Sequence, residues 1–385
     1  MSIAVGAIRL AIEDMIMRTI SVATTIVALA AISLLRPAAA QQAATAAVPV
    51  PALKGLDPVL LADGSEKPGR EDLAVQQGQY LYRFATEGNL ATFRADPTHY
   101  EIQFGGGCAR MGPLSGLGDP DRFHVHDGRI YIFASDACRE GFKKRTELFF
   151  DPDTACPKAD AGALQRGRDL LDRVLAAHGG VARLRAVRSF RFERSVTKGE
   201  VTQAWRVFVG FPDRIRIEQD YTQSNQSWHY AKVATATVGF FLNEGEARPM
   251  HASGRREMRR TALREPLFAL RHAAAGNVVA IAGAKTVVHG VAVEPLVLWC
   301  DGVETTFGIG QDGRIATASY RGRGPQLWFG SVEHVFGDYV ERSGIMTPQK
   351  VTAYFDGARA EANDEQRTAV STDGELAEEL FTVPR

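Results

Sequence analysis

The chain has 385 residues, which is enough for two or three domains that each bury a hydrophobic core. Its 45 basic and 45 acidic residues cancel at neutral pH, so the sequence offers neither a basic field for nucleic acid nor an acidic excess for cationic partners. A nucleic-acid partner is therefore not expected.

The first forty residues have the pattern of an export signal. Arg18 precedes an apolar run over residues 20–35, and the small residues Ala38-Ala39-Ala40 follow it. We expect a signal peptide over residues 1–40, cleaved near Ala40, and then a linker over residues 41–54, which predicts a periplasmic or secreted protein. The alternative is an uncleaved membrane anchor, because the apolar run approaches the length that spans a bilayer. No other membrane contact is expected.

A short repeat organises the next segment. Residues 81–96 are similar to residues 130–145, and each copy has the pattern of a strand that leads into a helix. Asp127-Gly128 predicts the tight turn of a hairpin before the second strand, and the residues Thr86 and Ser135 are predicted helix N-caps. The matched residues are Tyr82, Phe84, Ala85, Thr86, Glu87 and Phe93 in the first copy and Tyr131, Phe133, Ala134, Ser135, Asp136 and Phe142 in the second.

Residues 55–150 resemble the YHS domain. In metal-binding members of that class, a cysteine follows the Asp-Pro-Val element and two more flank the helix start after the aromatic strand. Leu60, Ala85 and Asn89 stand at those places in the first half, so the resemblance implies that its metal site is lost. The resemblance rests on Asp57-Pro58-Val59, Tyr82-Arg83-Phe84-Ala85, Phe93, Asp96-Pro97, Tyr100, Gly105-Gly106-Gly107-Cys108-Ala109 and Val125-His126-Asp127-Gly128-Arg129-Ile130-Tyr131.

In the second half, the resemblance implies that Cys108 lies near Cys138. His124 and His126 are two residues apart on a predicted strand and so point to the same side. Two thiolates with one or two imidazoles suit zinc or copper, which makes these four residues the candidate metal site. Two alternatives stay open: a Cys108–Cys138 disulfide in an oxidising compartment, or a reactive thiol at Cys138, at the start of a helix. Cys156 is a second potential partner of Cys138.

A second domain is predicted over residues 162–385, after a linker over residues 151–161. It begins with a helix that has an apolar stripe and ends at Gly179-Gly180. Strands with alternating, β-branched or aromatic residues follow it. The chain is therefore predicted to be α+β, a small duplicated hairpin-helix YHS domain followed by a mainly antiparallel β half-barrel with packed helices. The strand-like segments are residues 190–192, 205–211, 214–219, 287–300, 305–309, 316–320, 332–339 and 351–355.

This second domain resembles the outer-membrane lipoprotein-carrier superfamily. The resemblance implies an open barrel whose apolar concavity holds acyl chains or another apolar ligand, and residues 255–275 then form a helix placed as a lid. The alternative is that the apolar side chains simply fill the barrel. The residues that carry the resemblance are Ala177-His178-Gly179-Gly180, Leu184-Arg185-Ala186-Val187-Arg188-Ser189, Phe211-Pro212-Asp213-Arg214-Ile215-Arg216, Phe336-Gly337-Asp338-Tyr339, Gly344-Ile345-Met346-Thr347-Pro348 and Phe381-Thr382-Val383-Pro384.

The sequence favours a binding protein over an enzyme. It contains no G-x-S-x-G elbow, H-E-x-x-H helix, C-x-x-C pair or Walker loop, and no catalytic residue is assigned. The prediction is an exported periplasmic binding protein, with a metal or thiol site in the first domain and a cavity for a lipid or other apolar small molecule in the second. A thiol- or metal-dependent enzyme and a non-catalytic envelope assembly factor are the alternatives.

Overall fold

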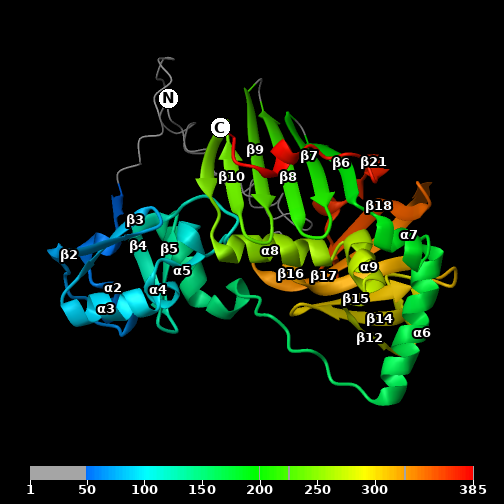
Figure 1. The fold of residues 1–385 in the computed structure, drawn as a ribbon, viewed down its shortest axis with the longest axis horizontal. Helices are drawn as coiled ribbons and strands as arrows, with labels where there is room; N and C mark the ends of the chain where they lie inside the picture. Colours follow the sequence, from blue (N-terminus) through cyan, green and yellow to red (C-terminus); the bar gives the residue numbers. More distant parts are fainter. Residues whose placement is uncertain (1–48, 199, 224–225, 325–326, 385) are drawn as a thin grey trace. The chain divides into compact units, whose positions relative to one another are not determined.

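A computed structural model describes residues 49–198, 200–223, 226–324 and 327–384 (Figure 1). The predicted signal peptide, and the predicted linker as far as residue 48, lie outside these residues. The described residues form two compact units that divide between Phe149 and Phe150. None of the described helices is both long and apolar enough to cross a membrane.

The first unit packs short helices against small sheets. The alternate aromatic residues Tyr80, Tyr82 and Phe84 of β3 are buried, and Tyr82 and Phe84 contact Phe93 of α3. β3 is the central strand of a sheet ordered β1-β3-β2, and β4 and β5 pair antiparallel around the turn at Asp127. The elements are β1 (Val50–Pro51), α2 (Pro58–Ala62), β2 (Arg70–Gln77), β3 (Tyr80–Phe84), α3 (Glu87–Ala95), α4 (Pro97–Tyr100), β4 (Asp119–His126), β5 (Arg129–Phe133) and α5 (Asp136–Lys144).

The predicted order of strand then helix occurs twice in this unit, as β3–α3 and β5–α5. Both helices begin with the same cap. The Thr86 hydroxyl accepts from the backbone N–H of Asn89 at 3.1 Å, and the Ser135 hydroxyl accepts from the backbone N–H of Cys138 at 3.1 Å. The two caps place Asn89 and Cys138 at the same position in their helices.

The second unit contains two open antiparallel sheets, and the strands described do not close into a barrel (Figure 1). The first sheet is ordered β11 (Glu246–Pro249), β10 (Gly239–Asn243), β9 (Gln226–Ala234), β8 (Arg214–Gln223), β7 (Val201–Gly210), β6 (Ser189–Lys198) and β21 (Thr368–Thr372). The second is ordered β12 (Val279–Ala282), β14 (Val291–Cys300), β15 (Val303–Ile309), β16 (Ile315–Arg323), β17 (Phe329–Arg342), β18 (Ile345–Phe355) and β19 (Ala358–Arg359), with β13 (Thr286–Val288) on β14 and β20 (Glu365–Gln366) on β18.

Helices cover these sheets at defined places. α6 (Ala161–Ala177) lies along β12, and a methyl group at Gly167 would meet the carbonyl oxygen of Ala280 at 2.2 Å, so only glycine permits this approach. The single lid helix predicted over residues 255–275 is two helices, α8 (Ala252–Leu263) and α9 (Pro266–Ala274). Pro266 ends the first because it cannot continue a helix, and it starts the second at a position that suits it.

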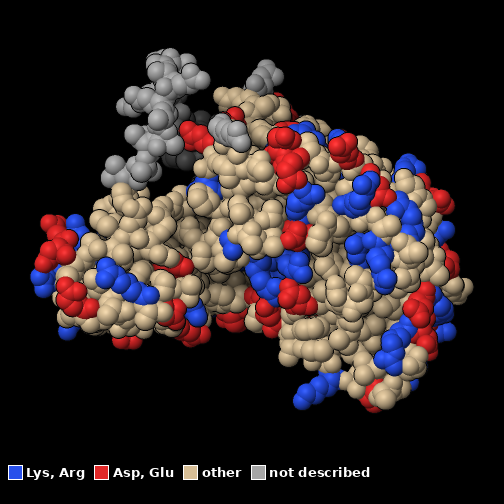
Figure 2. Space-filling view, viewed as in Figure 1, with Lys and Arg blue, Asp and Glu red and all other residues tan. Residues whose placement is uncertain are grey.

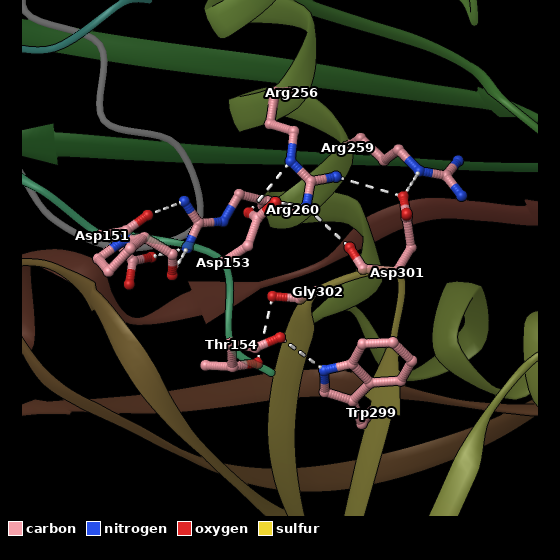
Figure 3. A network of polar contacts seen from close by, with 10 residues as sticks. Asp151, Asp153, Thr154, Arg256, Arg259, Arg260, Trp299, Asp301 and Gly302 are labelled. Atoms are coloured by element: carbon pink, nitrogen blue, oxygen red, sulfur yellow. Dashed lines mark hydrogen bonds and ion pairs between the residues drawn. The ribbon is translucent and has the colours of Figure 1, made fainter. Parts of the chain in front are cut away.

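Residues 151–160, which we call the strap, have no helix or strand but are bound to the second unit (Figure 3). The side chain of Asp151 is only 6% exposed and forms ion pairs with Arg260 at 2.5 Å and Arg264 at 2.9 Å. Further along, the carbonyl oxygen of Thr154 accepts from the indole N–H of Trp299 at 3.0 Å. The predicted linker is therefore part of the second unit.

Candidate functional site

Cys108 and Cys138 lie side by side in the first unit. Cys108 is fully buried at the end of the glycine-rich turn, and Cys138 is partly exposed on the first turn of α5. Each thiol shifts the pKa of the other, and no disulfide joins them. The structure thus brings together the two cysteines that the sequence predicted to be neighbours.

The surroundings of the pair favour negative charge on Cys138. The hydrogen bond from Cys108 lowers the pKa of Cys138 well below its ordinary value; burial opposes this, and hydrogen bonds from Ser135 and Arg110 add to it. The same hydrogen bond to Cys138, together with burial, raises the pKa of the Cys108 thiol. Sequence reasoning did not identify Arg110, which carries no local signal for this contact.

The predicted histidine ligands pack against an aromatic ring of α5. His124 and His126 share one side of β4, as expected, but each packs edge-on against Phe142 with ring centroids 6.3 Å apart. Within the described residues, no group of three or more His, Cys, Asp or Glu side chains is gathered that could hold a metal ion. Protein zinc sites use three or four such ligands, so the two thiols alone do not fit the predicted zinc or copper site, which stays a prediction.

The first half of the unit holds a polar pair where the second half holds thiols. Asp57 is fully buried, and its carboxylate accepts four hydrogen bonds. Two come from the backbone of Val59 and Leu60 at the start of α2, one from the backbone of Ala85 at 2.6 Å, and one from the side chain of Asn89 at 2.7 Å. Leu60, Ala85 and Asn89, the three residues named in the YHS resemblance, thus all donate to this one carboxylate.

A cleft opens in the second unit between its two sheets and beside α8 and α9. The cleft has a volume of about 70 Å³ and opens to solvent at its mouth. Aromatic and branched side chains form most of its walls, so the cleft suits an apolar group. The walls include Phe190 and Phe192 of β6, Val207 of β7, Ile217 of β8, Phe268 of α9 and Phe336 of β17.

Charged residues line the inner part of the same cleft. Arg367 donates to both carboxylate oxygens of Glu265 at 3.0 Å and to Glu365 at 2.8 Å. Arg194 lies 3.5 Å from Glu365 and covers the ring of Trp205 at 4.0 Å. Burial opposes ionisation of Glu365, but the charges of Arg367 and Arg194 outweigh it and lower the pKa of that carboxyl. The cluster therefore keeps its charges although water is largely excluded.

His334 also lines the cleft, and one of its ring nitrogens has no hydrogen-bond partner among the described residues. It is 6% exposed, and no described residue hydrogen-bonds its Nε2 atom. Its ring lies between Tyr320 and Phe336, at centroid distances of 5.7 and 6.0 Å. Burial lowers the pKa of His334 to about 4, so the ring is neutral at pH 7. A neutral imidazole can donate or accept one further hydrogen bond here.

The strap reaches this cleft through Arg264. The Arg264 side chain lines the cleft, covers the ring of Tyr320 at 4.7 Å, and is held at 2.9 Å by Asp151 of the strap. On the visible face of the second unit, basic and acidic side chains are interspersed rather than gathered into a field of one sign (Figure 2). The arginines of α8 thus form ion pairs with nearby aspartates.

No family model matches the sequence, and no curated protein is significantly similar to it. Solved structures similar to this chain include a DUF1329 family protein from Desulfovibrio piger, with 11% identity and a TM-score of 0.37 over 57% of this chain and 97% of that chain. A putative outer membrane lipoprotein-sorting protein domain from Vibrio parahaemolyticus has 7% identity and a TM-score of 0.34 over 57% and 97%. A LolA superfamily protein from Nitrosomonas europaea has 10% identity and a TM-score of 0.36 over 56% and 97%.

Two of these three structures belong to the class that the second half of the sequence resembles. The TM-scores of 0.34 to 0.37 establish neither a family nor a function for this chain.

Proposed function

We propose that this chain is an exported binding protein whose second unit carries an amphipathic ligand of the acyl-chain type in the cleft. The observation that carries this proposal is the combination, in one cleft, of apolar walls with the buried Nε2 atom of His334, which has no partner among the described residues. Leaving a buried polar group without a hydrogen bond costs about 1–3 kcal/mol. A ligand whose polar end bonds to His334 recovers that cost.

The shape and polarity of the cleft support this class of ligand. A cleft of about 70 Å³ accepts only a small portion of a ligand, and the rest would lie beyond its mouth. The apolar walls suit the hydrocarbon part, and the charged cluster around Arg367 suits a polar end. The export signal predicted over residues 1–40 supports a periplasmic location for such a carrier.

A fatty acid that carries an environment-sensitive fluorophore provides the test. The exported protein should bind it with a fluorescence increase that unlabelled fatty acid reverses. Val207→Phe places a ring in the mouth and should weaken binding roughly tenfold or more, because overpacking costs about 1–3 kcal/mol. Val287→Phe is the matched control, since Val287 is 64% exposed on β13 and remote from the cleft lining.

Absence of binding by the unaltered protein would refute the carrier role and would favour the envelope assembly factor. Equal binding by both valine variants would show that the ligand binds outside this cleft. His334→Leu tests the polar end of the ligand alone. It should weaken binding of a fatty acid and leave binding of a hydrocarbon without a polar end unchanged.

A further inference from the structure

The two halves of the first unit build one arrangement twice with different side chains. Asp57 and Cys108 occupy matching places, because the carbonyl oxygen of each accepts from the backbone N–H four residues later, at 2.9 Å in both cases. Asn89 and Cys138 match as the third residues of helices with equivalent caps. The Asp57–Asn89 pair of the first half therefore corresponds to the Cys108–Cys138 pair of the second.

The correspondence extends to the backbone around each pair. The N–H of Ala85 bonds to the Asp57 carboxylate, and the backbone of Ala134 bonds to the Cys108 sulfur. Ala85 and Ala134 are matched residues of the repeat. Because a carboxylate and an amide satisfy this arrangement in the first half, the fold itself does not require thiols at these places. The two cysteines therefore supply chemical reactivity, not a contact that the fold needs.

The pair has an outer and an inner thiol. Cys138 is partly exposed, whereas Cys108 is fully buried, and each thiol shifts the pKa of the other. The guanidinium of Arg110 hydrogen-bonds the Cys138 sulfur and lies against α5 at Gly141, where a methyl group would come within 3.2 Å of its Nε atom. An exposed thiol beside a cation, with a second thiol in reach, is the arrangement that exchanges with disulfides.

We propose that Cys108 and Cys138 are a redox-active dithiol that exchanges with small disulfides of the glutathione class. The Cys138 thiolate attacks one sulfur of the external disulfide, which forms a mixed disulfide and releases one external thiolate. Cys108 then loses its proton and attacks the Cys138 sulfur, forming the internal disulfide at about 2.0 Å and releasing the second external thiolate. The protein loses two electrons and two protons, and the external disulfide becomes two thiols. This inference does not depend on the cleft.

The test is a redox titration of the full chain in glutathione buffers, followed by acid quenching, alkylation and peptide mass spectrometry. Cys108 and Cys138 should lose alkylation together in one two-electron transition, while Cys156 and Cys300 stay alkylated. The proposal is overturned if Cys138 joins Cys156 instead, or if no Cys108–Cys138 disulfide forms at any potential. Protection of both thiols by equimolar Zn²⁺ alone would also overturn it, in favour of a metal site.

Variants give each thiol a separate readout. Cys108→Ser should trap glutathione on Cys138 as a stable mixed disulfide, and Cys138→Ser should trap none; the reverse pattern would contradict the assigned order of attack. Arg110→Gln should slow formation of the mixed disulfide roughly tenfold by removing the neighbouring cation. The double variant Cys108→Asp with Cys138→Asn copies the first half of the unit, and should fold normally and show no transition.

Discussion

His178 is expected to make the second unit sensitive to acid. Its side chain is 1% exposed at the end of α6, where Nδ1 donates to the carbonyl oxygen of Met346 at 2.9 Å and Nε2 accepts from the backbone N–H of Ile315 at 3.2 Å. The contact with Ile315 requires a neutral ring, because a protonated ring has no acceptor. Burial lowers the pKa of His178 to about 4.

The size of the effect follows from this difference in pKa. The unfolded chain takes up a proton at His178 near its ordinary pKa of 6.5, and the folded chain does so only near 4. The stability from the neutral ring is therefore complete above about pH 6.5 and is lost as the pH falls toward about 4. A shift of this size corresponds to about 3 kcal/mol.

The assay is urea unfolding followed by tryptophan fluorescence. All four tryptophans, Trp205, Trp228, Trp299 and Trp328, lie in the second unit, so the signal reports that unit alone. The variant His178→Gln removes the titrating group. Its free energy of unfolding should lie below that of the unaltered protein near pH 7, and the gap should shrink by about 3 kcal/mol near pH 4. A gap that does not change with pH would refute the reasoning.

Three further substitutions test contacts that stabilise the first or the second unit from within. Asp57→Ala leaves buried amides of the first unit without an acceptor, and should lower its thermal stability by about 3 kcal/mol, measured by near-ultraviolet circular dichroism; an unchanged transition would contradict the network. Asp151→Asn should cost about 3–5 kcal/mol in tryptophan-detected unfolding, because Arg260 is left buried without its counter-charge. Gly167→Ala should cost about 1–3 kcal/mol in the same assay, since the methyl group meets Ala280; a neutral result would mean that α6 can shift away.

Much of the fold follows from local sequence patterns. The predicted strands from residue 190 to residue 355 fall within observed strands, except that the predicted strand over residues 205–211 runs one residue past β7 and residues 287–300 form two strands joined by a turn. β9 was missed because its first half is polar and because Lys232, a charged residue, lies buried opposite Ile217. The sequence predicts one helix over residues 255–275, but Pro266 divides this segment into α8 and α9 because proline cannot continue a helix.

The candidate sites were predictable only in part. The proximity of Cys108 and Cys138 came from the resemblance to a known domain, which encodes a three-dimensional arrangement that spacing alone does not contain. The charged cluster of the cleft has no such signal, since Arg367 and Glu265 are separated by 102 residues. Contacts of this kind arise from the pairing of distant segments, and nothing in the local sequence marks them.

The strap has a consequence for where the second unit begins. A shortened chain that started at α6 would keep every strand and helix of that unit, yet it would lack Asp151 and leave Arg260 and Arg264 buried without their carboxylate. Such a fragment should aggregate or expand around α8, because an uncompensated buried charge is strongly destabilising. A fragment intended for ligand studies should therefore start no later than Phe150, eleven residues before α6 begins at Ala161.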